Sequence, residues 1–131
     1  MADTSGVGAV MATTPSALSI ALFKTLDSGD VDGWADHLTE DVRLQFGNAA
    51  PVTGRDAVRD LMRGFLGRVR GVRHEVLDES DVDDTVILRL RVTCVRPDGA
   101  EVTVPAANIL HLRGDRIADY EVYVDLSPVA A

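Results

Sequence analysis

TVILRLRVTCV, residues Thr85–Val95, is the longest β-branched stretch in the chain. Apolar and polar residues alternate along it, which is the period of a strand with one buried face. The next residues, Arg96–Gly99, read Arg-Pro-Asp-Gly, in which Pro presets φ and Gly supplies a positive φ. Val102–Leu112 follows as a partner strand, and Pro105 indicates an edge or a bulge near its start. Together these segments predict a long β-hairpin.

Shorter strands are predicted on both sides of this hairpin. Toward the C-terminus, Gly114-Asp115 predicts a turn and Ile117–Leu126 predicts a strand that closes the sheet. Toward the N-terminus, Val72–Leu77 predicts a strand, and the acidic run Asp78–Asp84 predicts the turn after it. The acidic run lacks the central Gly and the terminal Glu of an EF-hand loop. We therefore interpret it as a solvated turn and not as a metal site.

Helical periodicity replaces this alternation in the N-terminal half. Thr14-Pro15 predicts a helix start, and apolar residues at helical spacing continue to Ser28-Gly29. Asp30 is predicted to cap a second, short helix. A short strand at Val42–Phe46 precedes a third, amphipathic helix at Val58–Val69. Two helices, a strand, a helix and an antiparallel meander predict an α+β fold with the helices on one face of the sheet.

Length and charge limit the domain organisation and the partners. The 131 residues have room for one domain, predicted at residues 15–127 between a flexible arm (1–14) and a short tail (128–131). The formal net charge of −8 opposes broad binding to nucleic acid or to an anionic membrane. We find neither a signal-peptide pattern nor a stretch near the ~20 apolar residues of a membrane helix, so we expect a cytoplasmic protein. The single cysteine, Cys94, excludes an internal disulfide.

Familiar catalytic and metal-binding motifs are absent from the sequence. It holds no nucleophile elbow, phosphate loop or dinucleotide fingerprint. The histidines are far apart, and no pair has metal-ligand spacing, so we expect neither a metal nor a cofactor. These histidines are His37, His74 and His111. Arg55, Arg59 and Arg63 recur every four residues between acidic neighbours, which favours a solvent-exposed face with salt bridges.

Polar residues on otherwise apolar strands are the remaining candidates for chemistry. Asn108 has only apolar neighbours in sequence, and a buried amide needs a hydrogen-bond partner. Arg91 and Thr93 share one face of their strand, where a buried arginine would need a carboxylate or an anionic ligand. Alternation places Tyr120 on the same face as Val122. Spacing alone leaves structural and catalytic roles open for all of them.

Four short strings resemble the nuclear transport factor 2-like superfamily. They are Leu26–Asp30 (LDSGD), Thr39–Val42 (TEDV), Gly54–Val58 (GRDAV) and Arg116–Tyr120 (RIADY). Within that superfamily the chain is similar to the SnoaL-like polyketide cyclases and to limonene-epoxide hydrolases, over residues 16–127. The resemblance implies a cone-shaped, curved antiparallel sheet with three helices that enclose an apolar pocket. It does not imply one activity, because the same cone serves isomerases, dehydratases, hydrolases, cyclases and binding proteins.

The resemblance also maps known catalytic positions onto this chain, where most of them hold other residue types. The aspartate base of SnoaL-type cyclases falls on Val122. Limonene-epoxide hydrolases use an Arg and two Asp; the Arg is matched by Arg91, while the Asp positions fall on Thr93 and Val122. Their assisting Tyr and Asn fall on Leu44 and Phe46.

Ketosteroid isomerase gives a similar result. Its base falls on Phe46 and its tyrosine on Leu22, whereas its protonated aspartate falls on Asn108, which can still donate a hydrogen bond. The resemblance therefore implies an apolar pocket with few polar groups. The residues predicted to bind substrate there are Leu22, Trp34, His37, Leu44, Phe46, Thr93, Val122 and Val124.

The resulting functional prediction is an enzyme for a hydrophobic, carbonyl-bearing substrate, of the cyclase or isomerase type. Asn108 and Tyr120 would donate to a developing oxyanion, Arg91 would add positive potential, and His37 or water would move protons. Two alternatives stay open. One is a binding protein for a small hydrophobic ligand without catalysis, and the other is a module that forms homodimers through the outer face of the sheet.

Overall fold

The computed structural model describes residues 15–130. Its strands form one six-stranded sheet. The strands lie in the order β2-β1-β6-β5-β4-β3. Their bounds are β1 (Leu38–Phe46), β2 (Val52–Thr53), β3 (Gly71–Val82), β4 (Thr85–Val95), β5 (Glu101–Arg113) and β6 (Arg116–Val124). The helices in this part of the chain are α2 (Ala17–Asp27), α3 (Val31–Ala35), α4 (Arg55–Leu66) and a final short turn of helix, α5 (Ser127–Ala130).

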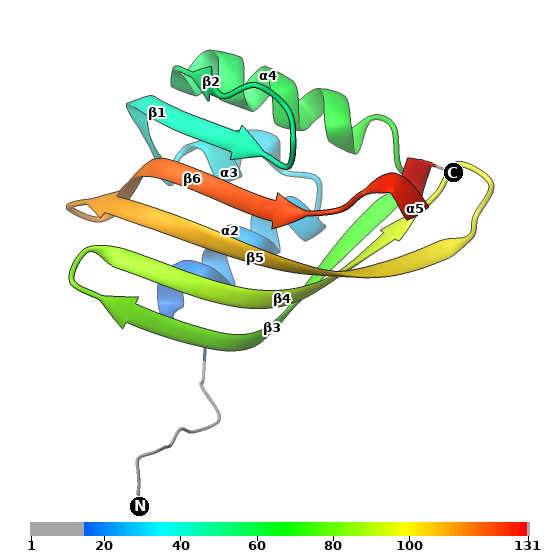
Figure 1. The fold of residues 1–131 in the computed structure, drawn as a ribbon. Coiled ribbons are helices and arrows are strands. Elements are labelled where there is room, and N and C mark those ends of the chain that lie inside the picture. Colours follow the sequence, from blue (N-terminus) through cyan, green and yellow to red (C-terminus); the bar gives the residue numbers. More distant parts are fainter. Residues whose placement is uncertain (1–14, 131) are drawn as a thin grey trace, which may run out of the picture.

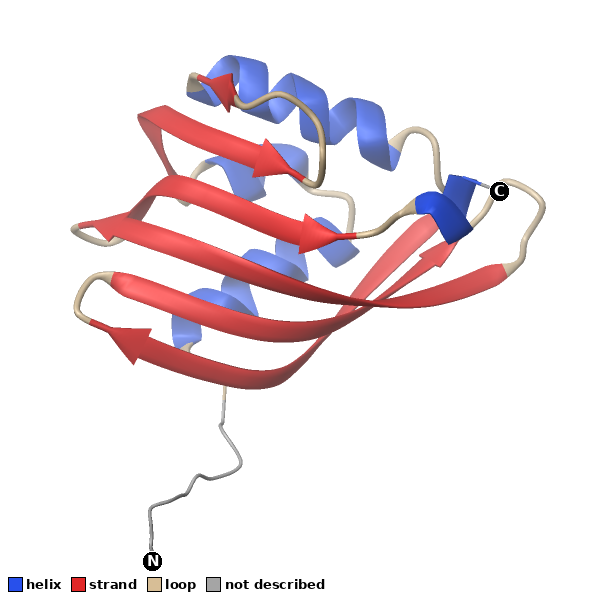
Figure 2. Ribbon diagram, viewed as in Figure 1, coloured by secondary structure: helices blue, strands red, loops and turns tan. Residues whose placement is uncertain are grey.

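The sheet is antiparallel except for one pair of strands. β3, β4, β5 and β6 form the predicted meander, whereas β1 runs parallel to β6. The long strands bend strongly, and α2, α3 and α4 all lie on the same side of the sheet (Figures 1 and 2). These features confirm the predicted α+β class with helices on one face of a curved sheet.

The first described helix begins two residues later than predicted. Its N-cap is Ser16, whose hydroxyl accepts a hydrogen bond from the Ser19 N–H at 3.2 Å. This bond satisfies a free amide of the first turn, which explains the start at the next residue. The predicted cap Thr14 and the predicted arm 1–14 lie outside the described residues. Asp30 caps α3 through its carboxylate, as predicted.

The acidic run at residues 78–84 is mostly strand, so the predicted turn was too long. β3 continues to Val82, and only Asp83 and Asp84 turn, Asp83 with a φ of 54°. Pairing with β4 along this whole segment outweighs the low strand propensity of aspartate. A bulge between Val76 and Asp78 precedes the segment, and Glu79 is buried there between the half-buried Asp78 and the exposed Ser80.

The C-terminal strands match the predicted pattern with small differences. β5 is central in the sheet, but its pairing with β6 begins only at Ala106. Pro105 therefore lies where one side of β5 is unpaired, in agreement with the predicted local edge. β6 ends at Val124, and α5 occupies most of the predicted tail with Val129 half-buried.

The core lies between the concave face of the sheet and the helices, and it is mainly aliphatic. On β4 the predicted alternation is confirmed, since Leu88, Leu90, Val92 and Cys94 face inward. Burial raises the pKa of the Cys94 thiol. Within residues 15–130, none of the helices has the length and apolar character needed to cross a membrane.

The arginine stripe on α4 makes ion pairs, as predicted, but only Arg63 is exposed, while Arg55 and Arg59 are half-buried. Arg59 contacts Asp56 at 2.9 Å, and Arg63 contacts an acidic residue of α3 at 3.0 Å. Arg55 donates to the backbone carbonyl of Leu38 at 3.1 Å. These bonds fasten α4 to α3 and to the start of β1.

Candidate functional site

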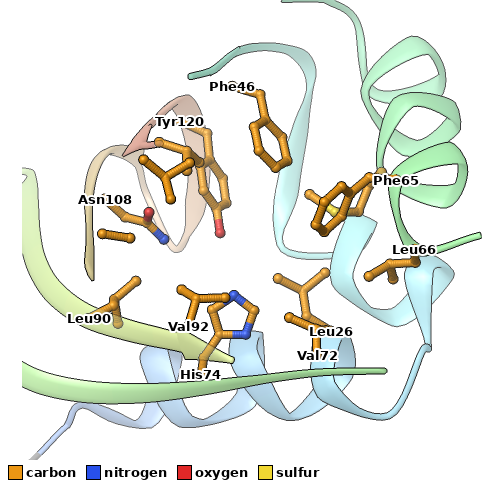
Figure 3. A pocket seen from close by; sticks show the side chains of 14 residues that line it. Leu26, Phe46, Phe65, Leu66, Val72, His74, Leu90, Val92, Asn108 and Tyr120 are labelled. Carbon is orange, nitrogen blue, oxygen red and sulfur yellow. The ribbon is translucent and has the colours of Figure 1, made fainter. Parts of the chain in front are cut away.

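A pocket opens between the concave face of the sheet and helices α2 and α4 (Figure 3). It encloses about 490 Å³ with its open mouth included, of which the centres of water molecules can occupy about 40 Å³. Its lining residues are Leu26, Phe46, Met62, Phe65, Leu66, Val72, His74, Leu90, Val92, Ala106, Asn108, Tyr120, Val122 and Val124. Among residues 15–130, only His74, Asn108 and Tyr120 bring polar groups to this wall.

The apolar wall follows from strand alternation. Val122 and Val124 share the inner face of β6, and Phe46 lies at the end of β1 directly opposite Val122. The Phe46 ring packs against Phe65 of α4, with ring centroids 5.3 Å apart. The structure therefore places the predicted residues Phe46, Val122 and Val124 in the pocket.

Tyr120 and Asn108 project into this space from neighbouring strands, β6 and β5 (Figure 3). Both side chains are buried, with exposed fractions of 1% and 3%. The Tyr120 hydroxyl and the amide nitrogen of Asn108 point toward the same region of the pocket (Figure 3). Burial raises the pKa of the Tyr120 phenol well above its ordinary value, so this group stays a neutral hydrogen-bond donor.

The amide oxygen of Asn108 is buried and has no hydrogen-bond partner among the described residues. An unpaired buried acceptor costs about 1–3 kcal/mol of stability. Such a cost is typical of functional sites, because polar groups without a structural partner are retained there for a ligand. The Asn108 oxygen therefore contributes no hydrogen bond to the part of the fold that the structure describes.

His74 of β3 faces these two donors from the opposite side of the pocket. Its Nδ1 lies 2.7 Å from Oδ1 of Asp27, at the end of α2, and its backbone N–H donates to Oδ2 of the same carboxylate at 3.0 Å. The Phe23 ring stacks on the imidazole at 4.7 Å. Because Asp27 accepts the proton on Nδ1, the tautomer with a free Nε2 lone pair is favoured. That Nε2 atom points into the pocket (Figure 3).

Asp27 and His74 thus form the arrangement of an oriented general base. Sequence reasoning considered His74 only as a metal ligand and missed this role. One signal was present, since Val72, His74 and Val76 alternate on one face of their strand and Val72 is buried. The partner carboxylate lies 47 residues away in sequence, and no local pattern indicates that contact.

Arg91 and Thr93 lie on the outer face of the sheet, which corrects their predicted placement in the pocket. Arg91 contacts Glu75 of β3 at 3.7 Å, and Thr93 shares a hydrogen bond with Thr103 of β5 at 2.8 Å. Strand alternation explains this result, because the inner face of β4 is occupied by Leu90 and Val92. The positive potential expected from Arg91 is therefore not available inside the pocket.

Four further residues that were predicted to bind substrate lie beside the pocket and not on its wall. Leu22 and Leu44 are fully buried in the core. Trp34 packs behind Tyr120, with ring centroids 5.7 Å apart. His37 is half-buried between α3 and β1, where its carbonyl accepts from the Ile117 N–H at 2.8 Å. In residues 15–130, no three His, Cys, Asp or Glu side chains cluster closely enough to hold a metal ion.

Comparison with known proteins agrees with this architecture. The model of the SnoaL-like domain matches residues 20–120, which is most of the chain. The protein belongs to the SnoaL-like domain family. No curated protein sequence is significantly similar to this SnoaL-like chain.

Solved structures show the same fold at low sequence identity. A hypothetical protein from Catenulispora acidiphila DSM 44928, with a ketosteroid isomerase-like fold and bound trimethylamine, has a TM-score of 0.81 at 18% identity, over 88% of this chain and 91% of that one. A proposed SnoaL-like polyketide cyclase from Jannaschia sp. CCS1 has a TM-score of 0.75 at 20% identity, over 86% of each chain. An LEH-like epoxide hydrolase from M. tuberculosis has a TM-score of 0.73 at 17% identity, over 86% of this chain and 84% of that one. At these identities the similarity shows the shared fold, and the activity has to be argued from the site.

Proposed function

We propose that this SnoaL-like protein is an enzyme that removes a proton next to the carbonyl group of a small hydrophobic substrate, in an isomerase- or cyclase-type reaction. The observation that carries the proposal is the placement of His74 Nε2 across the pocket from the Tyr120 hydroxyl and the Asn108 amide (Figure 3). A base on one side and two donors on the other fit a ketone whose oxygen and adjacent carbon are reached from opposite walls.

The proposed chemistry needs no group beyond these side chains and the substrate. Nε2 of His74 takes the proton from the carbon next to the carbonyl, and the C–H electron pair forms the enolate carbon–carbon double bond. The negative charge moves to the carbonyl oxygen, which accepts hydrogen bonds from Tyr120 and Asn108. With a β,γ-unsaturated ketone, the His74 imidazolium returns the proton to the γ-carbon of the dienolate and completes an isomerisation. If the enolate carbon instead attacks a second carbonyl of the same substrate, a ring closes and the imidazolium gives its proton to the new alkoxide oxygen.

Asp27 stabilises the imidazolium that forms on His74, because its carboxylate is already bonded to Nδ1 at 2.7 Å. The apolar wall strengthens both the interaction of Asp27 with the imidazolium and the hydrogen bonds to the oxyanion, since charges interact more strongly when water is excluded. A single well-placed oxyanion donor is worth about 3 kcal/mol in comparable sites. Two donors and an oriented base are the groups that an enolisation requires.

Hydrogen–deuterium exchange of a simple ketone tests the proposal without knowledge of the natural substrate. In D₂O the wild-type protein is expected to accelerate exchange of the α-protons of 2-tetralone, followed by proton NMR. His74→Gln removes the base and is expected to lower this rate by about 10²–10⁴-fold. His111→Gln is the matched control, because His111 lies on the outer face of the sheet with a half-exposed side chain.

The same experiment separates catalysis from binding alone. If the wild-type protein binds 2-tetralone but exchange is no faster than in buffer, the non-catalytic binding function is correct and the proposed enzyme is wrong. If exchange is accelerated equally by wild type and His74→Gln, the base has been assigned to the wrong residue.

A further inference from the structure

Trp34, which packs against Tyr120 of the pocket wall, is a buried tryptophan whose indole N–H lacks a hydrogen-bond acceptor among the described residues. The side chain is completely buried, and Nε1 has no acceptor in ordinary hydrogen-bond geometry among residues 15–130. A buried N–H without a partner costs about 1–3 kcal/mol, which a phenylalanine at this position would avoid. A tryptophan whose N–H is retained inside a core usually has an acceptor within reach.

The Tyr120 phenol is the polar group that Trp34 packs against. The two rings lie 5.7 Å apart at an angle of 58°. Burial raises the pKa of the Tyr120 phenol, and the donor group of the nearby Trp34 side chain partly lowers that pKa again. The unpaired indole N–H and the phenol oxygen therefore belong to two buried rings that pack against each other.

We propose that Trp34 is a positioning residue whose indole N–H donates to the Tyr120 oxygen. The phenol oxygen then accepts from Trp34 and points its own proton into the pocket. Hydrogen bonds in such a chain polarise one another, so a negative ligand oxygen on Tyr120 shortens the bond from Trp34. Bonds of this kind are often long in the ligand-free protein and tighten when the site is occupied. The inference rests on the donor role proposed above for Tyr120, but its first test requires no turnover.

The sequence contains one tryptophan, so the side-chain N–H of Trp34 gives a single indole cross-peak in a proton–nitrogen NMR spectrum. Tyr120→Phe removes the phenol oxygen and keeps the ring. We expect this variant to move the indole proton upfield, because the proton loses its acceptor. Tyr123→Phe is the control, since Tyr123 lies 52% exposed on the outer face of β6 and is expected to leave the cross-peak unchanged. An unchanged cross-peak in folded Tyr120→Phe, or equal shifts in both variants, overturns the proposal.

A second arm uses 2-naphthol, an oxygen-bearing planar ligand, with naphthalene as its oxygen-free control. In the wild-type protein, 2-naphthol is expected to move the indole proton further downfield than naphthalene does, and in Tyr120→Phe the two ligands are expected to act alike. A 2-naphthol shift that persists in Tyr120→Phe contradicts the relay through Tyr120. If the relay is confirmed while 2-tetralone exchange is absent, the proposed function fails and the positioning role stands.

Discussion

At the scale of single residues, the site consists of three polar groups set in an apolar wall. His74 is fixed by Asp27 and by the stacked ring of Phe23, and Tyr120 and Asn108 face it across the pocket. The Tyr120 ring is part of the core, but its hydroxyl points into the pocket, and the amide oxygen of Asn108 is unpaired among the described residues. The fold therefore keeps polar groups at a stability cost, which is typical of sites selected for function.

Substitution of Asn108 by leucine is expected to separate stability from activity. Leucine has nearly the same shape and removes the unpaired amide oxygen, so the free energy of unfolding is expected to rise by about 1 kcal/mol. The variant also loses an oxyanion donor, so ketone exchange is expected to slow by about 10²-fold. Urea unfolding and the 2-tetralone assay measure the two effects. A variant that is less stable and equally active contradicts the role given to Asn108.

Tyr120 is expected to make the protein sensitive to alkaline pH. Burial raises the pKa of the folded-state phenol above the ordinary value of about 10. Above about pH 10 the unfolded chain therefore releases this proton while the folded chain retains it, and the free energy of unfolding falls as pH rises. Tyr120→Phe lacks this group and is expected to lose less stability between about pH 8 and 11 in urea unfolding.

Tyr123→Phe serves as the control for this titration, because Tyr123 is exposed and its variant is expected to follow the wild-type pH dependence. Equal pH dependence of wild type and Tyr120→Phe shows that the phenol is not held neutral by burial.

At the scale of the elements, helix α2 is held in place at both ends by carboxylates. Its C-terminal residue Asp27 binds His74 of β3. At its N-terminus the buried Glu79, also of β3, accepts a hydrogen bond from the Ser16 N–H at 3.0 Å. The negative charge near the start of a helix is favoured by the helix dipole. The position of the base therefore depends on how firmly α2 is attached to the sheet.

Glu79→Ala is expected to lower the free energy of unfolding by about 2 kcal/mol, because a charge-assisted bond to a backbone N–H is lost in a buried place. Glu79→Gln retains an acceptor and is expected to lose less. Asp81→Ala, an exposed substitution two residues further on, is the control. Urea unfolding measures all three variants, and equal stabilities of Glu79→Ala and Asp81→Ala contradict the anchoring of α2.

The elements themselves were largely predictable from sequence, whereas their contacts were not. Alternation predicted which residues of β4 and of β6 share a face, and turn residues predicted the hairpin at Arg96–Gly99. The turn predicted for the whole acidic run was too long because aspartate has a low strand propensity, and only the pairing with β4 reveals the longer β3. Alternation also separated Arg91 from the apolar face of its strand but did not say which face lines the pocket.

The same distinction between local pattern and distant contact decides which residues of the candidate site could be predicted from the sequence. Asn108 stood out by its apolar neighbours in sequence and Tyr120 by sharing a strand face with Val122, and the structure places both in the pocket. His74 became a candidate only through its contact with Asp27, which joins the end of a helix to a distant strand. Local periodicity carries no information about such pairs, so the base of the site had to come from the structure.

At the scale of the whole molecule, the outer face of the sheet presents an apolar patch. Ile87 is 40% exposed and pairs across β4 and β5 with Ile109, while Tyr123 lies next to Ala107 across β5 and β6. The arginines beside this patch already have acidic partners on the same face. Such a face suits a second copy of the chain related by a twofold axis, and we expect a homodimer through it.

Light scattering after size exclusion is expected to give twice the chain mass of 14.0 kDa for the wild-type protein. Tyr123→Glu combined with Ile87→Glu is expected to give the monomer mass. Ile20→Glu is the control, because Ile20 is equally exposed but lies on helix α2. A monomeric wild type at tens of micromolar, or an unaffected double variant, contradicts the assignment of the face.

A crystal structure with 2-naphthol tests the central claim most directly, because this ligand has the planar shape of the enol of 2-tetralone. We predict that the naphthol oxygen lies within about 3.2 Å of the Tyr120 hydroxyl and the Asn108 amide nitrogen. The ring carbon next to that oxygen is expected to lie nearest to His74 Nε2. A ligand that places its oxygen at the open mouth of the pocket, away from Tyr120 and Asn108, contradicts the oxyanion-donor roles of these two residues.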